Sequence, residues 1–256
     1  MNPTPHREDL VTSQALPTSH HNSIFHFSVC SFTGVGHAIN QDSHAFRDGF
    51  AYVLADGVGG GAWGEIASAS LCSQLLSLDH VNEQLVDLAF TNADVLIASK
   101  LQELGFGPGA AVGIGLWPCA NSSHEWLVSW VGDCRMMHLQ PVTGQWKKKW
   151  LSTDQTYLNL KLNPPAGVGG DSPANMVGCG MGFPVSHHRL QWSEGERVVL
   201  ASDGFWGAVD LSVLDHELSH GLYSFSADMA QKLCQLAQSR GSQDDITVMV
   251  IERAAN

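Results

Sequence analysis

Five aspartates, each in a tight setting of small residues, are spread over nearly the whole chain. They are Asp42 in NQDS, Asp56 in LADGVGG, Asp133 in VGDCR, Asp203 in LASDGFWG and Asp244 in GSQDDITV. Hard divalent cations bind such carboxylates, and carboxylates that converge must be neutralised by a metal or by protons. Water held between two such cations becomes a nucleophile at neutral pH, which is the chemistry of phosphate ester hydrolysis. The aspartates therefore predict a metal site suited to phosphate esters.

An Asp-Gly pair alone commonly marks a tight turn, so a turn or cap role is the ordinary interpretation of any one of these aspartates. The repetition of the motif favours a metal site over separate turns, since Asp56 and Asp203 both follow a strand-like run and precede a glycine. Gly57 and Gly204 lack the Cβ that would keep a backbone carbonyl away from a ligand. The Gly57 carbonyl is therefore itself a candidate metal ligand.

Strand-like runs lead into three of these acids and follow a fourth, so each acid is expected at a strand end, where a sheet can bring them together. The pattern of apolar residues predicts strands at residues 24–32, 50–55, 110–117, 126–131, 135–140, 197–201 and 246–252. Helical spacing predicts helices at residues 62–78, 81–104, 211–220 and 227–239, and residues 141–184 are loop-rich. Consecutive strands interrupted by paired helices favour an α+β fold of stacked antiparallel sheets flanked by helices over a doubly wound parallel sheet.

The composition fits one core, because 256 residues of which 44% are hydrophobic contain no internal repeat. Residues 1–23 are polar and hold three prolines, which predicts a flexible N-terminal tail before a single domain over residues 24–256. At this size an independent monomer is expected.

The charge and the cysteines limit the partners and the compartment. An excess of 25 acidic over 13 basic residues gives a formal net charge of −12, which disfavours binding to nucleic acid or to an anionic membrane. No long apolar run and no secretory signal are present, so we expect no membrane insertion and a cytoplasmic protein. The six cysteines form no CxxC pair and are interpreted as reduced thiols. The adjacent histidine pairs at 20–21 and 187–188 lack the spacing of a shared zinc site.

Taken together, the motifs NQDS, ADGVGG, VGDCR, LASDGFWG and GSQDDITVMVI resemble those of the metal-dependent protein phosphatase (PPM, protein phosphatase 2C) family in order and approximate spacing. The similarity runs from about Gly34 to Glu252. It implies a four-layer α-β-β-α sandwich with a binuclear Mn²⁺ or Mg²⁺ site at one end of the central β-sandwich. The compact form and the ADGVGG variant indicate the bacterial type, and residues 24–256 would then form one metal-dependent phosphatase catalytic domain.

The resemblance also implies the catalytic and metal-binding residues. Asp56 would bridge the two metals and the Gly57 carbonyl would bind one of them. Asp203 and Asp244 would complete the protein ligands of the first metal, and Asp42 would support the cluster through bound waters. Asp133 would help hold a weaker third ion, and the loop-rich stretch would include a mobile flap that shapes substrate access.

Two positions depart from the pattern of better-known relatives. His37 stands where many of them have an arginine that grips the substrate phosphate, and an imidazole offers fewer donors than a guanidinium. His37 is therefore either a weaker phosphate-binding residue or a structural surface residue, and Arg47 or Arg135 could compensate. Val58 stands where eukaryotic relatives often have a histidine proposed to protonate the leaving group.

The implied function is a metal-dependent serine/threonine phosphoprotein phosphatase that opposes a serine/threonine kinase. Its partners would be phosphorylated Ser/Thr proteins and a cognate kinase or its substrates. Two alternatives stay open: a phosphoprotein-binding pseudophosphatase, and a metal-dependent phosphatase of small phosphate esters. The pseudophosphatase predicts eroded metal ligands, whereas every acidic position is intact here.

Overall fold

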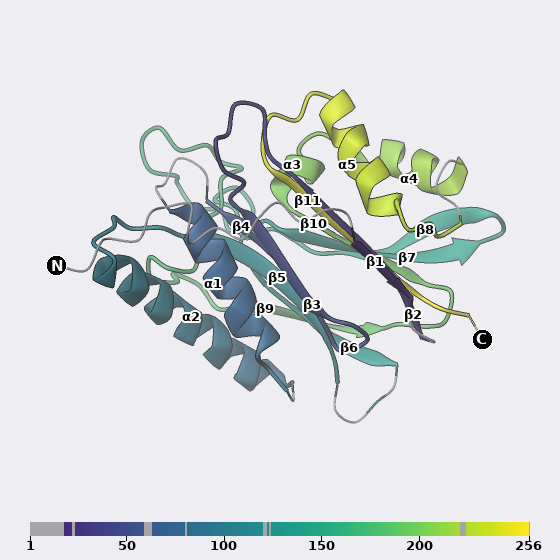
Figure 1. Cartoon of the computed structure of the whole chain (residues 1–256), viewed down its shortest axis with the longest axis horizontal. Helices are drawn as coiled ribbons and strands as arrows, with labels where there is room; N and C mark the ends of the chain where they lie inside the picture. Colours follow the sequence, from purple (N-terminus) through teal and green to yellow (C-terminus); the bar gives the residue numbers. More distant parts are fainter. Residues whose placement is uncertain are drawn as a thin grey trace.

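Two antiparallel β-sheets are stacked face to face, and helices cover both outer faces of the stack (Figure 1). The computed structural model describes residues 18–21, 24–58, 63–79, 81–119, 122, 124–220 and 224–255. Helices α1 (Gly64–Leu76) and α2 (Glu83–Glu103) lie on one outer face, and α4 (Leu211–His220) and α5 (Met229–Ser239) lie on the other. The predicted α+β fold, a four-layer α-β-β-α sandwich, is confirmed.

The first sheet has six strands in the order β1-β2-β11-β10-β7-β8. Their bounds are β1 (Thr18–His21), β2 (Phe25–Phe32), β11 (Ile246–Arg253), β10 (Arg197–Ala201), β7 (Arg135–Val142) and β8 (Gln145–Leu151). The second sheet has five strands in the order β3-β4-β5-β6-β9. Their bounds are β3 (Asp42–Arg47), β4 (Ala51–Gly57), β5 (Ala111–Pro118), β6 (Glu125–Val131) and β9 (Ser186–Gln191). One helical turn, α3 (Asp203–Trp206), directly follows β10.

Apolar side chains fill the three spaces between the four layers. Between the sheets, the ring of Trp126 lies 5.4 Å from that of Phe25 and 5.1 Å from that of Trp192. A second cluster joins α1 and α2 to the second sheet, and a third joins α4 and α5 to the first sheet. Full burial of a large apolar side chain contributes about 1.5–3 kcal/mol, so these three cores hold the strand ends in a fixed relation.

The helices α1, α2, α4 and α5 begin and end where the sequence predicts, within about three residues, whereas the single turn α3 was not predicted. The Asn82 side chain accepts a hydrogen bond from the Leu85 N–H at 2.8 Å and so caps the first turn of α2. Among the described helices, none combines the length and the apolarity needed to cross a membrane.

All seven strands predicted from the sequence are present, and four further strands were not predicted. These four are β1, β3, β8 and β9, and β8 lies inside the stretch predicted to be loop-rich. Each of them is the outermost strand at one side of its sheet.

The N-terminal segment is only partly covered by the described residues. Residues 1–17, 22 and 23 of the predicted tail lie outside them. Residues 18–21 form β1, which pairs antiparallel with β2 from Thr18 opposite Val29 to His21 opposite His26. This pairing occupies the side of β2 that does not face β11, where the backbone groups of β2 would otherwise lack a partner.

Candidate metal centre

Four of the predicted aspartates converge at one end of the sandwich. Asp42 begins β3 and lies directly opposite Asp56 in β4. Asp203 begins α3 after β10, and Asp133 lies in the turn between β6 and β7. The carboxyl groups of Asp56 and Asp203 lie close enough to shift each other's pKa, and the charges of Asp42, Asp203 and Asp133 all act on Asp56. The strand ends therefore bring these acids together as the sequence predicts.

Burial and mutual repulsion raise the pKa values of this cluster. Burial raises the pKa of Asp42 to about 8, with further contributions from the nearby charges of Asp245 and Asp203. Burial, together with Asp203 and Asp154, also raises the pKa of Asp133 to about 8. The pKa of Asp56 lies well above its ordinary value for the same reasons. At neutral pH the cluster therefore needs protons or cations to balance it.

The oxygen atoms of the cluster fit a hard divalent cation. The Oδ2 atom of Asp42 accepts a hydrogen bond from the Ser202 hydroxyl at 2.8 Å, whereas its buried Oδ1 atom has no hydrogen-bond partner among the residues that the structure describes. A buried carboxylate oxygen without a partner is costly unless an ion or water binds it. An all-oxygen donor set of carboxylates suits Mg²⁺ or Mn²⁺ better than softer metals.

The two glycines after Asp56 and Asp203 both lie where the backbone of another segment passes close by. A Cβ on Gly57 would lie 2.5 Å from the carbonyl group of Gly64, and one on Gly204 would lie 2.0 Å from the carbonyl oxygen of Asp245. Both glycines are therefore required because two backbone segments meet there, β4 against α1 and α3 against the start of β11. The Gly57 carbonyl as a metal ligand stays a prediction.

The two adjacent aspartates of GSQDDITV have opposite surroundings. Asp244 is exposed and lines a cleft, whereas Asp245 is buried with 3% of its surface exposed. Asp245 accepts hydrogen bonds from the backbone N–H groups of Gly34 and Gln41, both at 2.7 Å, and contacts Nδ1 of His37 at 3.1 Å. Asp245, which the sequence analysis missed, thus anchors the loop that leads into Asp42.

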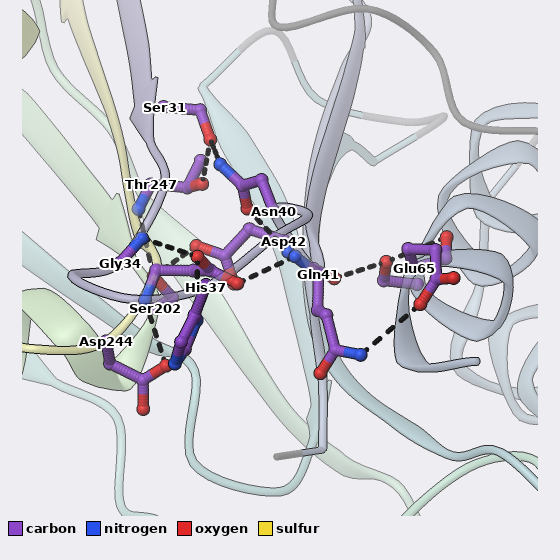
Figure 2. A network of polar contacts seen from close by, with 12 residues as sticks. Ser31, Gly34, His37, Asn40, Gln41, Asp42, Glu65, Ser202, Asp244 and Thr247 are labelled. Atoms are coloured by element: carbon purple, nitrogen blue, oxygen red, sulfur yellow. Dashed lines mark hydrogen bonds and ion pairs between the residues drawn. The ribbon is translucent and has the colours of Figure 1, made fainter. Parts of the chain in front are cut away.

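A second set of polar contacts holds that loop from the other side (Figure 2). The Asn40 side chain accepts from the Asp42 N–H at 2.9 Å and donates to the Ser31 hydroxyl at 2.9 Å. The Gln41 side chain donates to Glu65 of α1 at 3.3 Å. These contacts hold the backbone at the start of β3, where Asp42 enters the cluster, against both β2 and α1.

The cleft beside the cluster has a volume of about 440 Å³. It is lined by His37, Asp203, Gly204, Gly207, Ala208, Arg240, Gly241, Ser242, Gln243 and Asp244. Ligand atoms of His37, Asp244 and Asp245 lie within 4.8 Å of one another. This volume is in the range that holds more than a phosphoryl group, so the cleft admits part of the molecule that carries it.

The two arginines considered as substitutes for an arginine at position 37 are both engaged elsewhere. Arg47 lies at the far end of β3 from Asp42, where it pairs with Asp79 at 2.9 Å and lies over the Phe50 ring. It does not reach the cluster, so this interpretation is wrong. Arg135 lies near the cluster, since its charge lowers the pKa of Asp203, but its guanidinium makes a bidentate contact with Asp154 at 2.6 to 3.0 Å.

The turn that carries Asp133 is tied to the loop-rich stretch. Gln155 donates its N–H to the Gly132 carbonyl at 2.8 Å, and its side-chain oxygen accepts from the Gly132 N–H at 3.2 Å and from Asn175 at 2.8 Å. The side-chain oxygen of Asn175 accepts in turn from the N–H groups of Gly182 and Phe183. A pair of buried amide side chains thus links the predicted flap to the Asp133 turn.

The chain matches no family profile. One curated protein, "Probable protein phosphatase 2C 74" of Oryza sativa subsp. japonica, is 38% identical over 68 residues, which is 27% of this chain and 17% of that protein. Among solved structures, PppA, described as a key regulatory component of T6SS in Pseudomonas aeruginosa, has a TM-score of 0.73 at 22% identity, covering 90% of this chain and 98% of its own. The Mycobacterium tuberculosis serine/threonine phosphatase PstP/Ppp has a TM-score of 0.72 at 22% identity, and the match covers 91% of this chain and 100% of that one. The structure of the PstP catalytic domain in complex with two manganese ions has a TM-score of 0.71 at 22% identity, and the match covers 91% of this chain and 99% of that one.

The protein therefore has the fold of the bacterial-type metal-dependent protein phosphatases, and the predicted resemblance is confirmed at the level of the fold. The curated relative carries the name of the same family, but the match is confined to a short segment. The chain spans about a sixth of the length of that relative.

Proposed function

We propose that the protein is a metal-dependent serine/threonine phosphoprotein phosphatase. One observation carries the proposal: a cluster of buried carboxylates with raised pKa values, one of whose oxygens has no partner in the described part of the chain, lies beside a cleft. Structures of the same fold include one described as a complex with two manganese ions, which supports Mn²⁺ or Mg²⁺ here.

The ligand roles follow the sequence prediction. Asp42, Asp56, Asp203 and Asp244, with the Gly57 carbonyl, would hold two ions, and Asp133 would hold a weaker third. When bound, the ions supply a nucleophile from water at neutral pH and offset negative charge on the phosphoryl oxygens.

The other residues of the site orient these ligands and shape access. The Ser202 hydroxyl donates to Asp42 and fixes the orientation of that carboxylate. Asp245 holds the loop before Asp42 and contacts one nitrogen of His37, which leaves the other imidazole nitrogen for the cleft. His37 would thus offer at most one hydrogen bond to a phosphoryl group.

The substrates would be proteins phosphorylated on serine or threonine, and the enzyme would oppose a serine/threonine kinase. Two neighbours of this fold are described as a serine/threonine phosphatase and as a regulatory component of a secretion system, which supports a signalling role. A cytoplasmic, monomeric enzyme is part of the proposal, and the free thiols of all six cysteines fit a reducing compartment.

The pseudophosphatase is the weaker alternative, because the converging acids Asp42, Asp56, Asp133 and Asp203 are all present and an uncompensated buried charge cluster is expensive without its ions. A phosphatase of small phosphate esters would use the same centre. The cleft, which admits more than a phosphoryl group, favours a larger substrate.

The test is hydrolysis of phosphoserine, phosphothreonine and phosphotyrosine peptides and of p-nitrophenyl phosphate, with Mn²⁺ titrated after chelator treatment. We expect Mn²⁺-dependent turnover of the phosphoserine and phosphothreonine peptides that is lost in Asp203→Ala. Measurable Mn²⁺ binding without turnover of any substrate would favour the pseudophosphatase. Turnover of p-nitrophenyl phosphate alone would favour small esters.

A further inference from the structure

The cleft beside the metal centre is lined by two carboxylates and one guanidinium. Asp203 and Asp244 supply its carboxylates, and Arg240 is the one lysine or arginine among its lining residues in the described part of the chain. Arg240 is exposed, and its guanidinium makes no hydrogen bond or ion pair with the described residues. A guanidinium with five free donors is the side chain best suited to bind phosphate oxygens.

Of the other basic groups discussed above, His37 has one ring nitrogen engaged and both arginines are ion-paired. The buried Asp245 carboxylate lies 3.1 Å from Nδ1 of His37, and Arg135 is held bidentately by Asp154. Arg47 pairs with Asp79 at the far end of β3. Arg240 is therefore the cation of the cleft that remains available to a substrate.

The backbone places Arg240 close to the predicted ligands rather than on a free loop. Its N–H donates to the carbonyls of Leu236 and Ala237 at the end of α5, at 3.1 and 3.2 Å. Two residues later, the Ser242 hydroxyl donates to the Gly204 carbonyl at 2.7 Å and joins this turn to the residue after Asp203. The turn is thus fixed at both ends, and Arg240 on it lines the cleft.

We propose that Arg240 binds the phosphoryl group of the substrate, in place of an arginine at position 37. This inference rests on the proposed phosphatase function and names the residue that would hold the substrate there. Arg240 contributes charge-assisted hydrogen bonds to phosphoryl oxygens and takes no part in holding the metal ions.

Arg240→Ala is tested with Mn²⁺-loaded enzyme on a phosphothreonine peptide and on p-nitrophenyl phosphate. We expect kcat/KM to fall about tenfold or more on both substrates, because losing a charge-assisted hydrogen bond to phosphate affects any ester. The inhibition constant of inorganic phosphate should rise by a similar factor, and Mn²⁺ affinity measured by calorimetry should not change. Lys232→Ala, on α5 outside the cleft and paired with Asp228 at 3.0 Å, is the matched control and should behave as the wild type.

A second variant tests whether an arginine at position 37 and one at position 240 bind the same phosphoryl group. In the Arg240→Ala background, His37→Arg should restore most of the lost kcat/KM. The single variant Arg240→Lys should retain part of the wild-type kcat/KM. The proposal is overturned by a change of less than about twofold on both substrates, by a loss confined to the peptide, or by a parallel loss of Mn²⁺ affinity. If the wild type hydrolyses neither substrate, the phosphatase function fails, and calorimetric binding of inorganic phosphate to the Mn²⁺-loaded proteins decides the role of Arg240 by itself.

Discussion

The two ends of β10 both carry buried charged groups, but only one end is balanced. At the start of the strand, Glu196 accepts from Lys149 at 2.6 Å, and Arg197 pairs with Glu252 of β11 at 2.6 Å. At the other end, Asp203 joins a cluster of carboxylates that has raised pKa values. Burial is therefore common to both ends, and the presence or absence of an opposite charge separates a structural cluster from a ligand site.

The balanced end shows how partners decide protonation. Burial alone would raise the pKa of Glu196, but the hydrogen bonds from Lys149 and from the Ser193 N–H lower it below its ordinary value. Burial lowers the pKa of His138 to about 4, so its 2.9 Å contact with Glu196 is a hydrogen bond from a neutral imidazole at neutral pH rather than an ion pair. Each charge of this cluster is satisfied within the protein, and no ion is needed.

The largest expected effect comes from changing the unbalanced end. Asp56→Asn should lower Mn²⁺-dependent turnover by about 10³-fold or more, because ligands of one centre act as a unit. The same variant should raise the melting temperature of the metal-free protein, since Asn is neutral without the proton that the buried Asp56 carboxylate, with its raised pKa, must take up on folding. Kinetics and thermal melting with and without chelator measure both effects, with Asp210→Asn, at an exposed position, as the control. A metal-free protein that melts at a lower temperature would mean that Asp56 stabilises the fold.

At the balanced end, Arg197→Met should destabilise the protein by about 3–5 kcal/mol, because it removes a fully buried guanidinium and leaves the partly buried Glu252 carboxylate without that ion pair. The Arg197 side chain is fully buried, and Glu252 is 17% exposed. Turnover per folded molecule should stay unchanged. Chemical denaturation measures the loss, and Arg189→Met, at a side chain that is 54% exposed, should cost less than about 1 kcal/mol. Equal effects of the two variants would contradict the contrast between the ends of β10.

The smallest effect is a pH dependence of the metal-free protein. Asp42 and Asp133 have a pKa of about 8 in the fold, against about 3.9 in the unfolded chain. Between these values the folded state binds more protons, so the stability of the metal-free protein should fall as the pH rises from 6.5 to 8. Below pH 6.5, His138 contributes the opposite slope, because its pKa is lower in the fold.

Metal ions should replace those protons. The rise in melting temperature on adding Mn²⁺ is therefore expected to be greater at pH 8 than at pH 6.5, and scanning fluorimetry at both values measures it. Arg197→Met should retain this pH dependence, whereas Asp56→Asn should weaken it. A larger Mn²⁺ effect at the lower pH would contradict the assignment of the raised pKa values to the metal centre.

The sequence predicted the interior of both sheets and missed their edges. The seven predicted strands are β2, β4, β5, β6, β7, β10 and β11, each paired on both sides. An interior strand is buried on at least one face and therefore carries a clear apolar pattern. Edge strands are kept polar or charged, as in QWKKKWL of β8 and SHHRLQ of β9. Their strand conformation depends on pairing with a neighbour, which local sequence does not encode.

The candidate site was predictable to the extent that it lies in motifs at strand ends. The convergence of Asp42, Asp56, Asp133 and Asp203 follows from the strands that precede or follow them. The separate roles of Asp244 and Asp245 were not predictable, because adjacent identical residues give no signal of which one faces the cleft. Arg240 was missed because a lone arginine at a helix end has no distinguishing spacing.

The position of β11 constrains how the chain can be made. This strand follows every other described element in sequence, yet it lies in the middle of the first sheet, between β2 and β10. A nascent chain must hold β2 and β10 apart, or leave both unpaired, until residues 246–253 leave the ribosome. Because Asp244 and Asp245 immediately precede this strand, the metal centre can assemble only at that same late moment. A ribosome stalled before Ile246 would therefore display two open strand edges, and the growing chain would depend on chaperones most strongly until β11 pairs with both of its neighbours.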